Sequence, residues 1–267
     1  MLSIAQRISR VVFPQSLRLR VHFFRKYQEY VFLKRKELGY GEDSLFSLHT
    51  APFLQDEKFA HAYALGEQTG SWHGLSIRWR AYIACWLGQY VSKLPGDFVE
   101  CGVNLGGLAR AIVDYTDFDT LGKKFYLIDT YSGMVPEYLT STEREKGLLE
   151  IYAYYKNNTK ENVIKTFSDF SSVCIVQGAV PDVLSEVPTR KVAFLSLDMN
   201  CTMPEIKAAE FFWDKMCPGG VILLDDYAQT LHLEQRKAFD LFARERGVTV
   251  LCLPTSQGVI FKPLTAG

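Results

Sequence analysis

The sequence lacks the features that would place it in a membrane or an oxidising compartment. It has no apolar run of about 18 residues, the length that a transmembrane helix requires. Its six cysteines are scattered, with no Cys-x-x-Cys pair and no zinc-ligand spacing. Arginines and Pro14 interrupt the first twenty residues, where the apolar core of a signal peptide would stand. We therefore expect a cytoplasmic protein with reduced cysteines.

The chain also lacks a charge excess, internal repeats and low-complexity segments. Its 30 Lys and Arg residues balance 30 Asp and Glu residues, so no global field attracts nucleic acid, and we expect no nucleic-acid partner. With 267 residues, 48% of them hydrophobic, the chain can bury one large core and need not divide further.

Although the net charge is zero, residues 1–40 are strongly basic. They hold nine Lys and Arg against two Glu, a net charge of +7, and aromatic residues are interleaved with the basic ones at near-helical spacing. Basic amphipathic helices can lie on anionic membranes, so one interpretation is peripheral membrane contact through this segment. The alternative is a helix with solvated charges that packs on the body of the protein or on a second subunit. We expect a homo-oligomer.

From residue 96 onward, strand and helix patterns alternate, which is typical of an α/β fold with a parallel sheet and crossover helices. The predicted strands are residues 97–101, 124–128, 173–176, 192–197, 220–224, 248–252 and 257–262. The predicted helices are residues 56–65, 77–94, 107–116, 143–167, 204–216 and 231–246. Residues 254–256 are too few for a crossover, so the last two strands should pair antiparallel.

A glycine-rich turn follows the first of these strands. Gly102 and Gly106 let backbone amides approach a ligand, and the N-terminus of the following helix favours negative charge. The Gly-x-x-x-Gly-Gly spacing differs from the G-x-G-x-x-G of dinucleotide folds, which argues against a nicotinamide-dependent dehydrogenase. Glu100, just before the turn, suits the cationic ammonium or sulfonium end of S-adenosylmethionine. The other interpretation is an ordinary tight turn between a strand and a helix.

Acids also follow the other strands, and ligands of open parallel sheets bind at the carboxyl ends of strands. Asp129 ends the second strand, where it can accept both ribose hydroxyls of an adenosine. Asp198, Asp225 and Asp226 follow the fourth and fifth strands. These three carboxylates repel one another unless a cation neutralises them, and their hard oxygens suit Mg²⁺. The alternative is that some of them cap helices.

Four segments together resemble the macrocin O-methyltransferase family. They are Leu-Pro-Gly-Asp-Phe-Val-Glu-Cys-Gly-Val (94–103), Leu-Ile-Asp-Thr-Tyr-Ser-Gly-Met (127–134), Pro-Gly-Gly-Val-Ile-Leu-Leu-Asp-Asp-Tyr (218–227) and Gln-Arg-Lys-Ala-Phe (235–239). The family comprises S-adenosylmethionine- and Mg²⁺-dependent enzymes that methylate sugar hydroxyls of natural products. The resemblance, which covers about 94–262, implies a Rossmann-like class I methyltransferase fold. We accordingly predict a seven-stranded, mostly parallel sheet with an antiparallel last strand, in a methyltransferase domain of residues 94–267 after a helical extension of residues 1–93.

The resemblance also implies roles for the acids and the glycine turn. Glu100, Gly102 and Asp129 would hold the methyl donor, and we extend this cofactor site to Val103, Gly106, Thr130, Ser132 and Gly178. Asp198, Asp225 and Asp226 would hold Mg²⁺, with Asp198 also a general base. The acceptor would be a small molecule with a sugar or glycoside hydroxyl.

The chain departs from the family pattern after the fourth strand. The family usually has Asp-x-Asp followed by a Tyr, whereas Asn200 stands at the second acid and Thr202 about where the Tyr would be. Asn offers a carbonyl oxygen but carries no charge. An acceptor that contacts this position would therefore differ from the usual one.

Several interpretations stay open at this point. His232 is the alternative general base, although surface or capping roles are commoner near the start of a helix. Residues 135–160, with four Tyr, form either a lid over the strand ends or a self-packed insertion, and residues 69–74 either cover a ligand or merely connect two helices. The alternative functions are a catechol-type O-methyltransferase that acts on an aromatic diol and a non-catalytic, membrane-associated module that keeps the fold.

Overall fold

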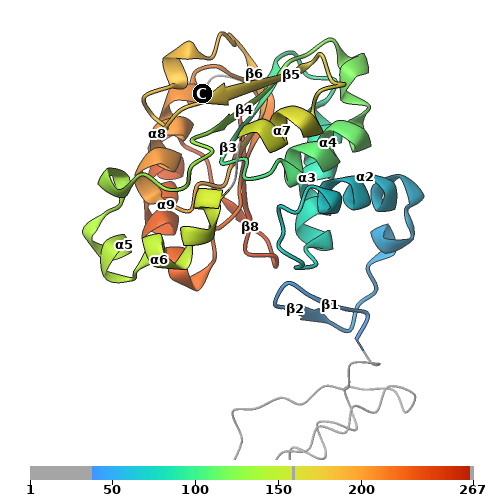
Figure 1. Cartoon of the computed structure of the whole chain (residues 1–267), viewed down its shortest axis with the longest axis horizontal. Coiled ribbons are helices and arrows are strands. Elements are labelled where there is room, and N and C mark those ends of the chain that lie inside the picture. The colour runs from blue at the N-terminus through green and yellow to red at the C-terminus, as the bar shows by residue number, and fades with distance from the viewer. Residues whose placement is uncertain (1–37, 158–159, 265–267) are drawn as a thin grey trace, which may run out of the picture. The chain divides into compact units, whose positions relative to one another are not determined.

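The computed structural model describes residues 38–157 and 160–264 (Figure 1). The predicted basic helix, with its membrane or subunit contact, lies almost entirely outside the described residues. The chain divides into two compact units, one ending at Pro52 and one beginning at Phe53, whereas the sequence suggested a boundary after residue 93. In the first unit, β1 (Tyr40–Glu42) and β2 (Leu45–Ser47) form an antiparallel hairpin that the sequence did not predict.

The larger unit is built on one seven-stranded sheet with the order β5-β4-β3-β6-β7-β9-β8. Its strands are β3 (Asp97–Cys101), β4 (Phe125–Asp129), β5 (Val173–Gln177), β6 (Val192–Leu197), β7 (Met216–Leu224), β8 (Leu251–Cys252) and β9 (Gly258–Phe261). β3 to β7 are parallel, β9 runs antiparallel to β7, and β8 runs antiparallel to β9. This confirms the predicted sheet and its antiparallel end.

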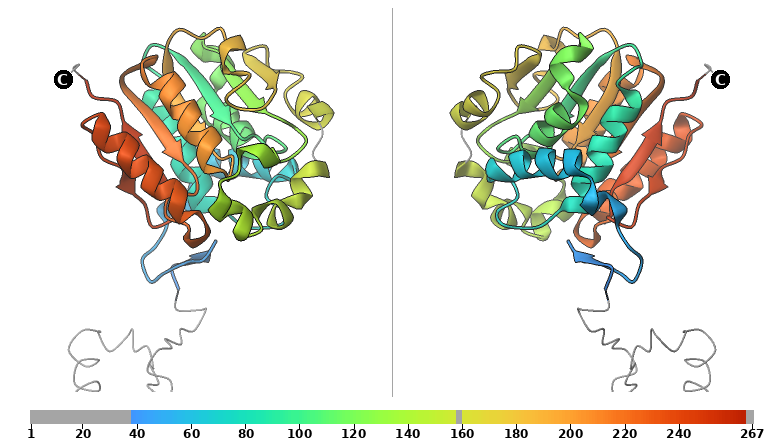
Figure 2. Two further views of the ribbon diagram at one scale, coloured as in Figure 1. Left: turned by 90° about the vertical axis from the view of Figure 1, so that its left-hand side faces the viewer. Right: turned by 90° about the vertical axis from the view of Figure 1, so that its right-hand side faces the viewer.

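Helices cover both faces of the sheet (Figure 2). One face carries α2 (Glu57–Gln68), α3 (Arg78–Val91) and α4 (Gly107–Thr116), and the other carries α8 (Thr202–Trp213) and α9 (Leu233–Glu245). Alternate residues of a strand face opposite layers. In β3, Phe98 lies against Gly88 of α3, whereas Val99 belongs to the core that contains Phe212 of α8 and Phe239 of α9.

The segment between β4 and β5 differs from the helix predicted over residues 143–167. It forms α5 (Ser141–Glu145), α6 (Leu148–Ile151) and α7 (Lys160–Thr166). Gly147, with φ +72°, separates α5 from α6 in a conformation that a helix interior does not adopt. The single-helix prediction was therefore wrong. Short 3₁₀ turns complete the chain at η3 (Pro52–Gln55), η4 (Phe118–Leu121), η5 (Pro136–Tyr138), η6 (Ala153–Asn157), η7 (Leu184–Glu186) and η8 (Thr230–His232).

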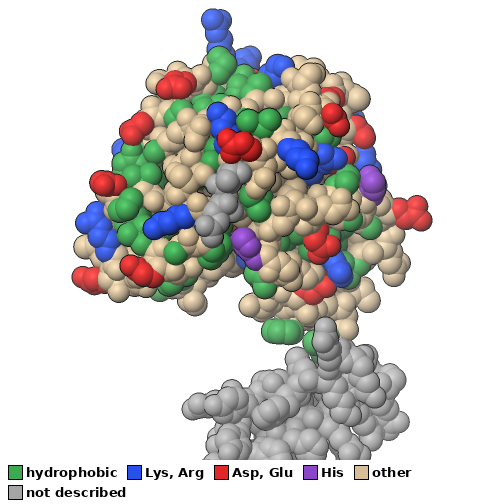
Figure 3. All heavy atoms as spheres, viewed as in Figure 1, with side chains coloured by type: hydrophobic (Ala, Val, Ile, Leu, Met, Phe, Trp, Pro, Cys, Tyr) green, Lys and Arg blue, Asp and Glu red, His purple; other side chains and the backbone are tan. Residues whose placement is uncertain are grey.

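The described surface carries charges of both signs, and the cysteines form no disulfide bond. Acidic and basic side chains are interspersed on the face that Figure 3 shows. All six cysteines are free, and Cys252 is exposed. Within residues 38–157 and 160–264, no helix is long and apolar enough to cross a membrane.

β3 and β6 approach each other closely where they end. Gly102 has φ +89°, and a Cβ atom built on it would lie 1.9 Å from the carbonyl oxygen of Asp198. A residue with a side chain would therefore collide with the backbone that carries Asp198, so this position requires glycine. The contact brings the glycine turn and the loop after β6 to one edge of the sheet.

We expect Gly102→Ala to lower the free energy of unfolding by roughly 3 kcal/mol or more. The change combines a positive-φ penalty of about 1–2 kcal/mol with an overpacking penalty of about 1–3 kcal/mol. Gly122→Ala is the matched control, because Gly122 has φ +66° but no atom within 4 Å of its built Cβ, so the backbone penalty acts alone. Urea denaturation of both variants measures the difference, and equal losses would contradict the steric argument.

Candidate active site

The structure gathers the predicted site residues at the carboxyl edge of the parallel strands. The ends of β3, β4 and β5 are neighbours and carry the residues predicted to bind the cofactor. The ends of β6 and β7 lie on the other side of β3 and carry the three aspartates. The two groups therefore meet at β3, where the direction of chain progression across the sheet changes.

Glu100 is a buried acid near the end of β3. It is 2% exposed, and its Oε2 atom has no hydrogen-bond partner. Burial, and then the charges of Asp129 and Asp225, raise the pKa of this carboxyl well above its usual value. A buried carboxylate oxygen without a donor is costly, so the position fits a cationic ligand group that brings N–H donors.

Asp129 ties the end of β4 to the glycine turn. Its Oδ2 atom accepts the N–H groups of Val103 (2.7 Å) and Asn104 (3.0 Å), and its Oδ1 atom accepts that of Tyr131 (2.8 Å). The N–H of Gly178 donates to the Asp129 carbonyl at 2.9 Å. A carboxylate offers about four acceptor sites, and these three bonds leave about one of them, so Asp129, which is partly exposed, can still accept from one ligand hydroxyl.

The other predicted cofactor residues differ in how they are held. Gly106 precedes α4 with φ +86°, and a Cβ there would lie 2.7 Å from the ring of Phe167. The Thr130 hydroxyl donates to the Gly133 carbonyl at 2.7 Å, and Ser132 is exposed in the same turn. These residues lie at the predicted edge, and their roles toward a cofactor stay predictions.

The polar loop of residues 69–74 packs on the glycine turn. Ser71 Oγ accepts the N–H of Gly107, the first residue of α4, at 2.8 Å, and the Ser71 carbonyl accepts the Asn104 side-chain amide at 2.9 Å. The ring of His73 meets that of Tyr154 edge to face, with the centroids 4.8 Å apart. The loop therefore joins the glycine turn to the insertion after β4.

Asp198, Asp225 and Asp226 converge as the sequence predicted. One carboxylate oxygen from each lies within 4.8 Å of the other two, and Asp225 and Asp226 are buried. Burial, followed by the charges of Asp225 and Asp226, raises the pKa of Asp198 well above its usual value, and Arg80 opposes this rise. Three hard oxygen donors at this spacing fit the chemistry of a Mg²⁺ site.

Asp225 already has two protein partners that the sequence did not reveal. Arg80 of α3 lies with Nη1 2.5 Å from Asp225 Oδ2, and Gln257 Nε2 donates to Asp225 Oδ1 at 3.0 Å. Arg80 and Gln257 are 145 and 32 residues away in the sequence. No local motif marks either residue, so only the fold brings them to the cluster.

A buried carboxylate holds the loop between β6 and α8. Glu205 Oε1 accepts the N–H groups of Met199 (2.8 Å) and Asn200 (3.1 Å), and Gln235 of α9 donates to Glu205 Oε2. Burial raises the pKa of Glu205 to about 8. Asn200, with φ +55°, donates its side-chain amide to Asp198 Oδ1 at 3.1 Å. The residue that departs from the family pattern thus orients Asp198.

His232 is buried beside the acidic cluster and does not lie on the surface. It is 2% exposed, and its Nε2 atom lies 2.9 Å from the Tyr152 hydroxyl and 3.8 Å from an Asp226 oxygen. Burial lowers the pKa of its imidazole to about 4, which keeps the ring neutral at pH 7. Its role as the alternative base stays a prediction.

The insertion after β4 is attached to α8 through Glu143. Glu143 Oε1 accepts the N–H (2.8 Å) and the hydroxyl (2.6 Å) of Thr202, the first residue of α8. Tyr152 and Tyr155 stack with centroids 5.7 Å apart and an interplanar angle of 7°. Burial, and then the charge of Asp198, raise the pKa of Tyr155, as expected for a ring near the cluster.

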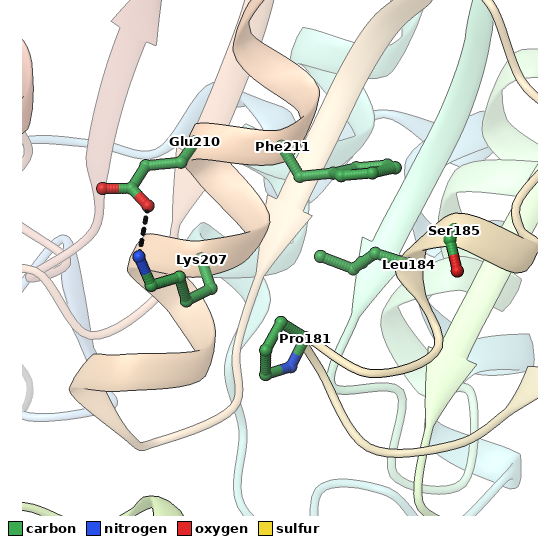
Figure 4. Close-up of a pocket in the computed structure, with 6 residues that line it drawn as sticks. All are labelled: Pro181, Leu184, Ser185, Lys207, Glu210 and Phe211. Atoms are coloured by element: carbon green, nitrogen blue, oxygen red, sulfur yellow. Dashed lines mark hydrogen bonds and ion pairs between the residues drawn. The ribbon is translucent and has the colours of Figure 1, made fainter.

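A separate cavity of about 380 Å³ lies between η7 and α8 (Figure 4). Its lining residues are Pro181, Leu184, Ser185, Lys207, Glu210 and Phe211. Pro181, Leu184 and Phe211 point toward one another, and Lys207 pairs with Glu210 at 2.8 Å. None of the predicted site residues lines this cavity, so we give it no part in the chemistry.

The sheet order and its antiparallel end define a Rossmann-like class I methyltransferase fold. The chain belongs to the macrocin-O-methyltransferase (TylF) family, whose model matches residues 79–255. This confirms the family resemblance found in the four sequence segments.

One relative resembles the chain in sequence, and two solved structures share its fold. The 8-demethyl-8-(2,3-dimethoxy-alpha-L-rhamnosyl)-tetracenomycin-C 4'-O-methyltransferase of Streptomyces olivaceus is 29% identical over 144 residues, 51% of this chain. The match spans about half, 54%, of that relative's length. The O-methyltransferase NovP shares the fold with a TM-score of 0.57 at 18% identity, over 83% of this chain and 86% of its own. The calicheamicin methyltransferase CalS11 shares the fold with a TM-score of 0.55 at 17% identity, over 80% of this chain and 94% of its own.

We expect His232→Gln to make the stability of the protein less dependent on pH in acid. The folded protein holds this imidazole with a pKa of about 4, against 6.5 for an ordinary His, so between these values the unfolded chain binds the proton and the folded chain does not. The wild-type free energy of unfolding should therefore fall as the pH drops through this window, by up to about 3 kcal/mol from His232.

Urea unfolding at pH 7 and pH 4.5 in the presence of chelator measures this dependence. His61→Gln, which changes an exposed His on α2, is the control. A wild-type slope in His232→Gln would show that burial of the imidazole does not contribute to the acid sensitivity.

Proposed function

We propose that this protein is an S-adenosylmethionine- and Mg²⁺-dependent O-methyltransferase that methylates a hydroxyl of a sugar or a glycosylated small molecule. The observation that carries the proposal is the convergence of Asp198, Asp225 and Asp226 next to the glycine turn after β3. An acceptor held at the aspartates would lie beside a donor held at the turn. Family membership and the relative that acts on a rhamnosyl group support a sugar acceptor.

The donor site is assigned to Glu100, Asp129 and the glycine turn. S-adenosylmethionine, when bound, supplies an already activated methyl group, so the protein needs to contribute alignment and a nucleophile. Glu100 Oε2, buried without a donor, would accept from the amino group. Asp129 would accept from a ribose hydroxyl at its remaining acceptor site. Its hydrogen bonds to Val103 and Asn104 hold the turn in shape for that contact.

The acceptor site is assigned to the acidic cluster. Asp198, Asp225 and Asp226 would hold Mg²⁺, which supplies Lewis acidity that lowers the pKa of a hydroxyl. Asp198 takes the proton of the acceptor hydroxyl, and a positioned base of this kind contributes about 10²–10⁴-fold. The bond from Asn200 occupies Asp198 Oδ1 and fixes the direction of the carboxylate. His232, neutral and next to Asp226, is the alternative base.

The stacked Tyr152 and Tyr155 favour a second candidate function. Their rings are partly exposed and lie near the acidic cluster, so an acceptor held at the cluster would lie beside aromatic side chains. Such side chains suit an aromatic diol as well as the apolar face of a sugar. A catechol-type activity through the same metal is therefore the second candidate.

Incubation with S-adenosylmethionine, Mg²⁺ and separate panels of glycosides and catechols tests the proposal. We expect mass spectrometry to detect a methylated glycoside. We also expect chelator to abolish turnover while leaving the affinity for S-adenosylmethionine nearly unchanged, because the residues assigned to the methyl donor lie at the ends of β3 and β4. Methylation confined to catechols would favour the second candidate. Full activity in chelator would remove the metal from the mechanism.

Glu100→Gln should weaken donor binding. The substitution keeps the shape of the side chain but removes a charge-assisted hydrogen bond, worth about 1.5–3 kcal/mol, or roughly 10- to 100-fold in Kd. Calorimetry with S-adenosylmethionine measures the loss, and Glu57→Gln, at an exposed acid of α2, is the control. Unchanged affinity in Glu100→Gln would remove Glu100 from the donor site.

A further inference from the structure

The acidic cluster contains a positive charge of its own. Arg80 and Asp225 form an ion pair of 2.5 Å, and their side chains are 14% and 8% exposed. In such a shielded position the attraction between two unit charges is several times stronger than at the surface. The guanidinium also acts on Asp198, whose carboxyl it stabilises in the charged form.

The Arg80 guanidinium is held in place by its helix and does not lose its proton. Arg80 lies on α3, which is anchored by the fully buried residues Ala81, Ala84 and Cys85. The guanidinium stays protonated at every pH at which proteins are folded. The aspartates therefore have a permanent counter-ion, which the repulsion among them requires in the absence of metal.

Both oxygens of Asp225 have a protein donor. Gln257, which is fully buried, donates to Oδ1, and the hydroxyl of Thr255 donates to Gln257 Oε1 at 2.9 Å. A divalent cation that used Asp225 would come close to the Arg80 guanidinium, and two positive charges at that distance repel strongly in a shielded site.

We propose that Arg80 is the resident counter-ion of the acidic cluster and that a divalent cation binds there by competing with Arg80 for Asp225. The inference rests on the Mg²⁺ site of the proposed function. It implies that the cluster is assembled without metal and that its metal affinity is limited by the guanidinium.

A different role for Arg80 predicts the opposite sign. Residues that hold a metal ligand in orientation strengthen metal binding, and their loss typically weakens it 10- to 100-fold. If Arg80 orients Asp225 for the metal, its removal weakens binding. If Arg80 competes with the metal, its removal tightens binding. The direction of the change in Kd therefore separates the two roles.

The test is a titration with Mn²⁺, with free Mn²⁺ measured by electron paramagnetic resonance. We expect Arg80→Met to tighten Mn²⁺ binding at least tenfold and Arg80→Lys, which keeps a charge, to stay near the wild type. Arg110→Met is the matched control, because Arg110 and Asp114 form a similar 2.5 Å pair on α4, with side chains 19% and 18% exposed. This control should leave the Kd unchanged.

A second measurement uses the melting temperature without substrate. In chelator, Arg80→Met should melt at a lower temperature than the wild type, because its aspartates have lost their counter-ion, and Mn²⁺ should restore most of the loss. Mn²⁺ should raise the Tm of the wild type less. Arg110→Met should not be rescued by Mn²⁺. If Arg80→Met fails to fold, Arg80→Gln takes its place, since its amide can donate to Asp225 without a charge.

The outcomes distinguish this inference from the proposed function. If the wild type binds Mn²⁺ and Arg80→Met binds it with equal or lower affinity, the competition is overturned and the metal site stands. Absence of Mn²⁺ binding in both proteins overturns the competition together with the metal part of the proposed function. Tighter binding in Arg80→Met, with Arg110→Met unchanged, supports the competition.

Discussion

Repulsion between buried carboxylates at the carboxyl edge of the parallel sheet is the constraint on which the site depends. Parallel strands bring their ends to one edge, and there the acids after β6 and β7 converge, while Asp225 also acts electrostatically on Glu100 near the end of β3. The protein offsets each charge differently. Arg80 neutralises Asp225, and backbone N–H groups solvate Asp129 and Glu205. The Oε2 atom of Glu100 has no hydrogen-bond donor, so Glu100 is the residue of this group best suited to a cationic ligand.

The same constraint explains why two loops are so tightly held. The glycine turn is fixed by Asp129 from the neighbouring strand, and the loop after β6 is fixed by Glu205 from the following helix. Gly102 allows the two loops to touch at the backbone. The residues that we assign to the methyl donor and to the acceptor are thereby aligned by contacts to the main chain, which change little when surface side chains are substituted.

The acids at the strand ends could be predicted from the sequence, whereas most of the side chains that contact these acids could not. Acids such as Asp129 and Asp198 directly follow short apolar runs, so their place at one edge follows from a parallel sheet. Arg80 reaches Asp225 across 145 residues, and no periodicity encodes that distance. β7 begins at Met216, four residues before the predicted start at residue 220, and continues through Pro218 and Gly219.

Asn200, which departs from the family pattern, has contacts in the structure that the sequence did not reveal. In the sequence, Asn200 replaces the second acid of the family's Asp-x-Asp pattern. In the structure its backbone is held by Glu205 and its amide by Asp198, so its principal contacts are within the protein. The loss of a charge at this position is also a gain of a hydrogen-bond donor to Asp198.

Glu143 has a consequence for how this chain can diverge. It lies 59 residues before Thr202, yet it is the side chain that satisfies the first N–H of α8. An insertion or deletion between β4 and α5 would pull Glu143 away, uncap α8 and disturb the loop that carries Asp198. The contact between Glu143 and α8 therefore constrains the length of this segment, whereas side chains within it that do not make the contact can be exchanged without moving α8.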